Sequence, residues 1–241
     1  TTNFLVMKNL LILGAGSAGT MMMNHLHNKL PKEWKITVVD KDPVHYYQPG
    51  FLFLPFDTYT EEQVKKDKKK FVPNSVNYIQ EGIDRIAAED KVVHLEDGKK
   101  LSYDLLIIAT GSHIAPEETE GMKGEGWHKD VFDFYSFEGA KNLRNKLRKW
   151  EGGNLVIHIT EMPIKCPVAP LEFAFLADDY FAKKGMRDKV NIQYVTPLSG
   201  AFTKPTAANK LGYLLEDKGV HIVPDFNIME VDNENKKIVS Y

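Results

Sequence analysis

A glycine-rich hexapeptide constrains the fold of this 241-residue chain more than any other feature. It is the sequence GAGSAG at residues 14–19, directly after the apolar run Leu10–Leu13. The next segment, Ala18–Leu30, has the character of a helix and ends at Pro31, and Ile36–Val39 is a second β-branched run. A strand, a glycine turn, a helix and a parallel strand form a βαβ unit, which places the chain in the α/β class.

The spacing of the glycines is the one that dinucleotide-binding βαβ units require. Gly14 permits the tight turn, Gly16 lets the backbone approach a pyrophosphate, and Gly19 allows close packing of helix on strand. The phosphates then lie at the positive N-terminal end of the helix. Asp40, 21 residues past Gly19, is placed to bind a ribose hydroxyl. The motif predicts a dinucleotide site, and a glycine turn kept for packing alone is the alternative.

The composition excludes several classes of protein. Apolar residues make up 43% and charged residues 27% of the chain, and the net charge of −2 gives no basic surface for nucleic acid. No apolar run reaches the ~20 residues of a transmembrane helix and no segment reads as a signal peptide, so we predict a cytoplasmic or peripheral membrane protein. The single cysteine, Cys166, excludes a disulfide framework, and the histidines lack metal-binding spacing, so no metal site is expected.

Strands and helices alternate twice along the chain. After the first α/β segment, Leu155–Ile159 reads as a strand, Leu171–Lys184 reads as a helix, and further strands and helices follow. This alternation predicts two three-layer Rossmann-like domains, at residues 7–115 and 116–241. The hairpin predicted at Val231–Tyr241 leads to no closing element, so we expect a further C-terminal part beyond this sequence.

A second motif indicates which dinucleotide binds. Leu101–Gly111 has the sequence LSYDLLIIATG, an apolar strand that follows a Tyr-Asp pair and ends in Ala-Thr-Gly. It resembles the second signature of flavoproteins with two dinucleotide-binding domains, which implies that FAD contacts the end of this strand and backbone groups at Ile83. The full set of residues predicted to contact FAD is Gly14, Ala15, Gly16, Ser17, Ala18, Gly19, Asp40, Lys41, Gln48, Pro49, Ile83, Ala109, Thr110 and Gly111.

The loop after the predicted strand Leu155–Ile159 lacks the glycines that a nicotinamide dinucleotide needs. No glycine occurs between Gly153 and Gly185, and three prolines in this loop remove N–H donors. The loop instead holds Cys166, beside Lys165 and shortly before a predicted helix, and both neighbours favour a thiolate. Cys166 is therefore a candidate catalytic residue, with a buried structural thiol as the alternative.

Two segments resemble the sulfide:quinone oxidoreductase family. They are residues 163–172, PIKCPVAPLE, which resemble its cysteine loop, and residues 45–49, HYYQP, which resemble its flavin-facing segment. The resemblance implies an enzyme that oxidises sulfide through a persulfide on Cys166 and passes electrons through FAD to a quinone. It implies that Glu172 accepts a proton. It also implies that sulfide and quinone are the small-molecule partners, and that the later part of the family's chain contacts a membrane. A homo-oligomer is compatible with the sequence.

Two other interpretations of the function stay open. A type II NADH:quinone dehydrogenase belongs to the same superfamily, although the glycine-free loop speaks against it. A non-catalytic FAD-binding relative is the second, because family members use a further cysteine and this chain contains only Cys166. The lysine run at residues 65–70 is interpreted as a solvated face, with attraction to an anionic membrane surface as the alternative.

Overall fold

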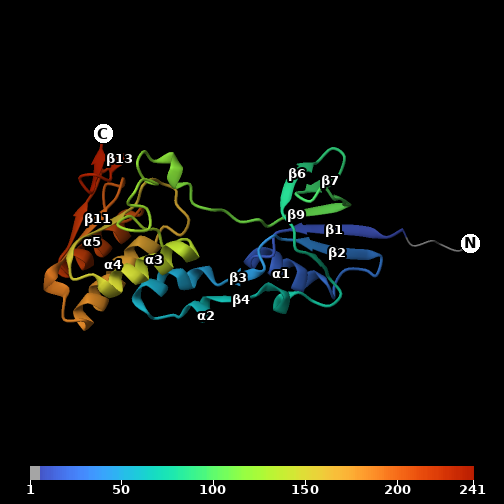
Figure 1. Ribbon diagram of the computed structural model, residues 1–241, viewed down its shortest axis with the longest axis horizontal. Helices are drawn as coiled ribbons and strands as arrows, with labels where there is room; N and C mark the ends of the chain where they lie inside the picture. The colour runs from blue at the N-terminus through green and yellow to red at the C-terminus, as the bar shows by residue number, and fades with distance from the viewer. Residues whose placement is uncertain (1–5) are drawn as a thin grey trace, which may run out of the picture. The chain divides into compact units, whose positions relative to one another are not determined.

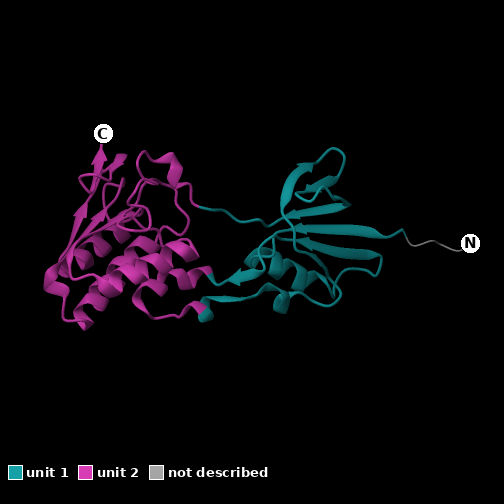
Figure 2. Cartoon of the chain, in the orientation of Figure 1, with its two compact units in different colours: residues 1–47, 62–113 teal, residues 48–61, 114–241 magenta. Residues whose placement is uncertain are grey.

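The computed structural model describes residues 6–241, so residues 1–5 lie outside the described part. The protein divides into two compact units: residues up to 47 together with 62–113, and residues 48–61 together with 114–241 (Figure 2). This division differs from the single boundary at residue 115 that the sequence predicts. The reason is that apolar side chains of residues 48–61, among them Leu52 and Phe56, pack in the core of the second unit.

The first unit is built on a parallel sheet with the strand order β5-β2-β1-β9 (Figure 1). The central strand β1 is buried from Leu10 to Leu13, and Met23 of the following helix is fully buried as well. A separate antiparallel sheet, β6-β7-β8, contains a hairpin between β7 and β8, whose turn has Gly98 at φ +86°. The helices and strands of this unit are β1 (Lys8–Leu13), α1 (Ser17–Leu26), β2 (Trp34–Val39), β3 (Val44–Tyr46), α2 (Glu61–Val64), β4 (Lys65–Asp67), β5 (Asn77–Ile79), β6 (Ile83–Ala87), β7 (Val92–Leu95), β8 (Lys100–Ser102) and β9 (Leu105–Ile108).

The second unit has a parallel sheet of its own, in the order β10-β11-β12. The side chains of Phe181, Ile192, Tyr194 and Leu215 are fully buried in its core. With two parallel sheets and their helices, the structure confirms the predicted α/β class with two Rossmann-like units. The helices and strands of this unit are α3 (Phe137–Lys149), β10 (Gly153–His158), α4 (Ala169–Lys183), β11 (Val190–Val195), α5 (Pro205–Asp217), β12 (Val220–Val223), β13 (Ile228–Asp232) and β14 (Lys237–Ser240).

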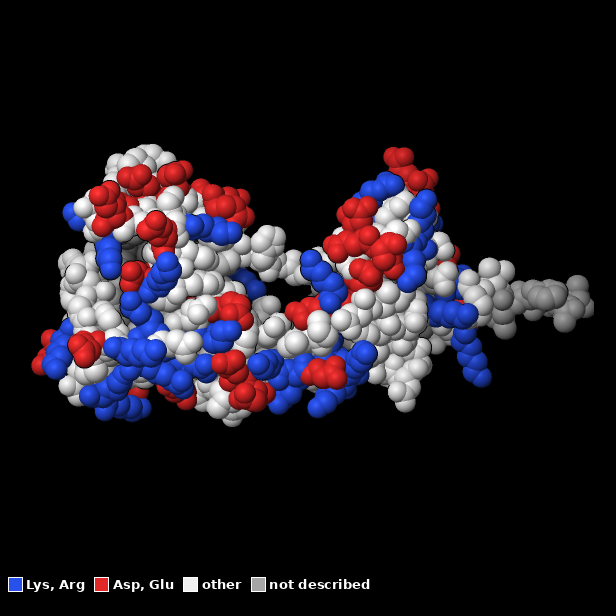
Figure 3. Space-filling model, in the orientation of Figure 1, with Lys and Arg blue, Asp and Glu red and all other residues white. Residues whose placement is uncertain are grey.

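Helix α3 holds one end of the segment 48–61 through two ion pairs. Arg144 pairs with Glu61, and Arg148, one turn further along the helix, pairs with Asp57. On the face shown in Figure 3, Lys and Arg side chains gather over the helices of the second unit with acidic side chains among them. The basic residues of α3 thus serve internal pairing as well as solvation.

Candidate functional site

Two glycines of the turn between β1 and α1 are required by the protein's own packing. Gly14 adopts φ +93°, and a Cβ at this position would overlap the carbonyl oxygen of Ala109. A Cβ on Gly19 would overlap the carbonyl oxygen of Gly14. Because Gly14 and Gly19 have no Cβ, the helix can begin close to the ends of β1 and β9.

Gly16 stands in a different environment. Its φ of −70° is open to any residue, and a Cβ there would meet no atom of the described residues within 4 Å. Gly16 is the N-cap of α1 and offers no side chain to the N–H groups of the first turn, where Ser17 and Ala18 are exposed. A Cβ at Gly16 would therefore meet no described atom, and an exposed helix N-terminus of this kind is a general binding site for anions.

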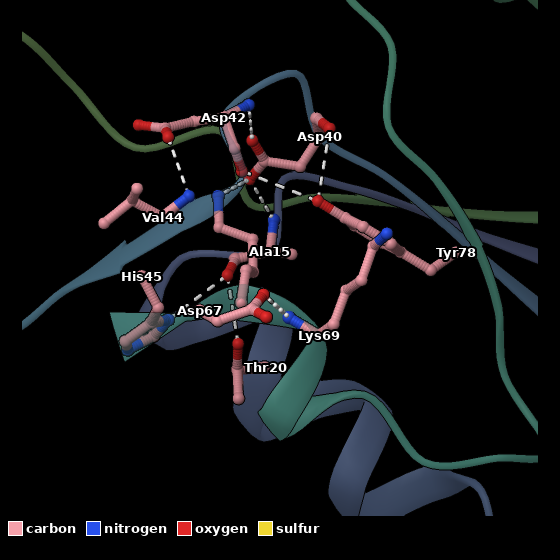
Figure 4. A network of polar contacts seen from close by, with 10 residues as sticks. Ala15, Thr20, Asp40, Asp42, Val44, His45, Asp67, Lys69 and Tyr78 are labelled. Atoms are coloured by element: carbon pink, nitrogen blue, oxygen red, sulfur yellow. Dashed lines mark hydrogen bonds and ion pairs between the residues drawn. The ribbon is translucent and has the colours of Figure 1, made fainter. Parts of the chain in front are cut away.

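The carboxylate of Asp40, at the end of β2, is already tied to this turn (Figure 4). Its Oδ2 accepts a hydrogen bond from the N–H of Ala15 at 2.6 Å. The same oxygen lies 2.8 Å from Nζ of Lys68, and Oδ1 accepts from the N–H of Asp42 at 2.9 Å. The structure thus brings the glycine turn and the predicted ribose ligand together, with Lys41 exposed beside them.

Tyr78 on β5 braces the turn that follows Asp40. Its hydroxyl lies 3.5 Å from the carbonyl oxygens of Asp40 and Asp42 (Figure 4). Burial, together with the negative charges of Asp40, Asp42 and Asp67, raises the pKa of Tyr78 to about 12, so the hydroxyl stays a neutral donor. The sequence contains no signal for this role, because a tyrosine on a short strand indicates only a position in a sheet.

The end of β9 lies at the same sheet edge as the glycine turn. Leu13 and Ile108 are partners in the parallel pairing of β1 and β9, and the N–H of Ala109 donates to the carbonyl of Leu13. Thr110 and Gly111 follow in exposed positions, with Gly111 at φ +75°. Residues 109–111 and the glycine turn therefore form one edge of the first unit, as their predicted common role requires.

Three predicted FAD contacts lie elsewhere in their units. Ile83 begins β6, and its half-buried side chain packs against the cluster that contains Leu13 and Val39. Gln48 and Pro49 are exposed and group with the second unit. Of these three residues, only Ile83 belongs to the compact unit of the glycine turn.

Cys166 is an exposed free thiol in the loop between β10 and α4. Its backbone is in the left-handed region, at φ +55°, and its carbonyl oxygen accepts two hydrogen bonds. One comes from the N–H of Ala169 at 3.1 Å and the other from the hydroxyl of Tyr135 at 3.3 Å. The alternative of a buried structural thiol is therefore wrong: the backbone is anchored and the sulfur side is open to solvent.

Side chains next to Cys166 connect its loop to two other segments. The ammonium of Lys165 donates to Oε1 of Gln48 at 2.6 Å. The ring of Tyr135 stacks on Phe134, and burial, with a smaller contribution from Cys166, raises the pKa of the Tyr135 hydroxyl. Glu172 is exposed in the first turn of α4. The loop thus presents the thiol to solvent, the first turn of α4 presents the carboxylate of Glu172, and Lys165 is bound to Gln48.

Sequence reasoning missed that the side chains of Lys68 and His158 are withdrawn from water. Lys68 is 3% exposed, so the prediction of a solvated face for residues 65–70 is wrong at this position, although Lys66, Lys69 and Lys70 are exposed. His158 ends β10, and burial lowers its pKa to about 4. A lysine inside a lysine run shows no sequence signal for burial, because only the tertiary contact with Asp40 makes burial favourable.

The described residues were compared with the requirements of a metal site and of a membrane-spanning helix. Residues 6–241 contain no group of three or more His, Cys, Asp or Glu side chains that could hold a metal ion. Within the same residues, every helix is too short or too polar to cross a bilayer.

The fold and the two loops define a class of protein: an α/β chain with two dinucleotide-type units, one with a complete glycine turn and one with a thiol in the corresponding loop. A family model described as pyridine nucleotide-disulphide oxidoreductase matches residues 8–159. The chain belongs to this oxidoreductase family.

Curated relatives narrow the resemblance further. The chain is 25% identical over 231 residues to the mitochondrial sulfide:quinone oxidoreductase of Dictyostelium discoideum, and 24% identical over 229 residues to that of Mus musculus. Each match covers 95% of this chain and 51% of the relative, so the chain spans about half the length of these proteins. The solved sulfide:quinone oxidoreductase of Aquifex aeolicus superposes with a TM-score of 0.81 at 20% identity, covering 97% of this chain and 56% of that one. These matches confirm the family resemblance that the motifs indicate.

Proposed function

We propose that this chain is the dinucleotide-binding and sulfur-binding part of an FAD-dependent enzyme that oxidises sulfide and passes the electrons to a quinone. The observation that carries the proposal is the loop of Cys166. An exposed thiol, anchored through its carbonyl by Tyr135 and Ala169, occupies the strand-to-helix loop in which a second dinucleotide unit would have a glycine turn. The names of the curated relatives support sulfide and quinone as the substrate classes.

The first unit supports FAD as the cofactor. The pyrophosphate would bind in the open space at Gly16, where it would accept hydrogen bonds from the N–H groups of Ser17 and Ala18 at the start of α1. Asp40 would accept a ribose hydroxyl. The exposed strand end at residues 109–111 would face the dinucleotide at the same edge. Lys41, Ile83, Gln48 and Pro49 stay predicted contacts, and bound FAD would supply a two-electron acceptor.

The second unit would bind the sulfur. One S–S bond forms between the Cys166 sulfur and HS⁻, which converts a thiol and hydrosulfide into a persulfide and releases one proton and two electrons. FAD, when bound, would accept these two electrons and pass them to a quinone. The proton leaves for solvent or for Glu172, the exposed carboxylate of the first turn of α4. The open sulfur side of Cys166 admits HS⁻, while the two hydrogen bonds to its carbonyl hold the backbone in place.

The test loads the protein with FAD and adds sulfide without oxygen, with the visible absorbance of the flavin as the readout. We expect bleaching in the parent protein and none in Cys166→Ser, with equal FAD content in both. Glu161→Gln, an exposed substitution in the same loop, is the control and should behave like the parent. Bleaching of Cys166→Ser at the parent rate would remove the thiol from the mechanism.

Two further outcomes decide between the alternatives. Faster bleaching by NADH than by sulfide would favour the NADH:quinone dehydrogenase interpretation, against the glycine-free loop with its prolines. A purified chain that binds no FAD would overturn the flavoenzyme proposal as a whole.

A further inference from the structure

The one buried ammonium of the lysine run lies inside the proposed nucleotide site. The side chain of Lys68 is 4% exposed and that of its partner Asp40 is 14% exposed, with 2.8 Å between Nζ and Oδ2. An ammonium withdrawn from water to this degree is stable only when it is paired. The contact is therefore a fixed part of the fold, in contrast to the neighbouring lysines that extend into solvent.

The backbone around Lys68 is fixed to the segment that follows Asp40. The N–H of Lys68 donates to the carbonyl of Pro43 at 2.9 Å, and Val44 pairs with Asp67 in the antiparallel ladder of β3 and β4. The Asp67 carboxylate accepts from the N–H of Lys69 at 3.0 Å and caps the short turn that begins at Lys68 (Figure 4). These bonds aim the Lys68 side chain at Asp40 before any ligand arrives.

The carboxylate of Asp40 has little accepting capacity left for a ligand. Of its about four lone-pair sites, Oδ2 uses two, for Ala15 and Lys68, and Oδ1 uses one, for the N–H of Asp42. One site on Oδ1 is left for a hydroxyl. The ammonium and the two N–H groups together set the orientation of that site.

We propose that Lys68 is a positioning residue for the adenosine ribose of the dinucleotide. It acts through Asp40 by holding Oδ1 in the orientation that accepts a ribose hydroxyl, and it touches no phosphate. This inference rests on the proposed FAD site. It assigns a function to a lysine that the sequence alone places on a solvated surface.

The test compares two ligands that differ only in the ribose hydroxyls: ADP, the half of FAD that this site would hold, and 2′,3′-dideoxyadenosine diphosphate. Dissociation constants are measured by calorimetry for the parent, Lys68→Met and the matched control Lys70→Met, which removes an exposed ammonium two residues away. We expect Lys68→Met to raise the dissociation constant of ADP about 10-fold or more. The dissociation constant of the dideoxy ligand should rise less than about 3-fold. Lys70→Met should leave both unchanged.

Further variants keep the result interpretable. Asp40→Asn should weaken ADP binding by a similar factor. Adding Lys68→Met to Asp40→Asn should weaken ADP binding little further, because Lys68 acts through Asp40. Should Lys68→Met fail to fold, two other comparisons replace it. Lys68→Arg is compared with the parent protein, and the double variant of Asp40→Asn and Lys68→Met is compared with Asp40→Asn alone. Equal weakening of both ligands by Lys68→Met, or no weakening of either, would overturn the inference. A parent protein that binds neither ADP nor FAD would instead overturn the proposed function.

Discussion

The loops that follow β1 and β10 start from the same arrangement, a parallel strand that leads into a helix, and end in different chemistry. After β1, residues 14–16 suffice to reach α1, and the helix N-terminus is open at Gly16. After β10, residues 159–168 separate strand from helix, with prolines and an exposed thiol in between. The strand–helix frame alone therefore does not decide the ligand. The decision depends on whether the loop offers free N–H groups or a reactive side chain.

The largest effect is expected for Gly19→Ala. The new Cβ would overlap the carbonyl oxygen of Gly14, so helix or turn must shift, and we expect a loss of about 3 kcal/mol or more in the free energy of unfolding. Urea unfolding measures it, with Gly16→Ala as the control because that Cβ meets open space. Equal stability of the two variants would contradict the packing role assigned to Gly19.

Gly16→Val separates ligand binding from folding in the same turn. Its branched side chain occupies only the space in front of the helix N-terminus, so we expect FAD affinity to fall at least about 100-fold while the free energy of unfolding changes by less than about 1 kcal/mol. Quenching of flavin fluorescence measures the affinity. Met21→Val, with the same branched side chain at an exposed position of α1, is the control. A normally loaded Gly16→Val would remove this turn as the phosphate site.

The last residues of β1 and β10 differ in their contribution to the pH dependence of stability. β1 ends in the buried apolar Leu13, whereas β10 ends in His158, whose pKa burial lowers to about 4. The unfolded chain binds this proton near pH 6.5 and the folded chain does not, so stability is complete above pH 6.5 and declines as the pH falls toward 4. We expect a loss on the order of 2 kcal/mol at pH 4 from this group.

Chemical unfolding at pH 7 and pH 4.5 tests this origin. His158→Gln should show a smaller loss of stability between the two pH values than the parent. His221→Gln, at an exposed position of β12, should match the parent. An unchanged pH dependence in His158→Gln would assign the acid sensitivity to other groups.

The smallest effect is expected for Tyr135→Phe. The variant removes one hydrogen bond to the Cys166 carbonyl, which keeps its bond from Ala169, so we expect a loss of about 1 kcal/mol in stability. The looser loop should also change the rate at which Cys166 reacts with a thiol reagent, whereas Tyr213→Phe, on an exposed ring, should change neither. Identical thiol reactivity in the Tyr135 variant would show that Ala169 alone anchors the loop.

The sequence predicted the local features well, because they depend on short-range rules. Glycine spacing between an apolar strand and a helix predicted the turn at residues 14–19. The burial of Lys68 and the bond from Tyr135 to Cys166 were missed. Both arise from segments that meet only in the folded chain, so no local pattern encodes them.

The grouping of residues 48–61 with the second unit has a practical consequence for dividing the protein. The chain passes from one unit to the other after residues 47, 61 and 113, so neither unit is a continuous stretch of sequence. A fragment cut at residue 115 would carry Leu52 and Phe56 without the core in which they are buried, and would expose them to water. The same cut would leave α3 without the acidic partners of Arg144 and Arg148. A single cut in the chain therefore does not separate the two units.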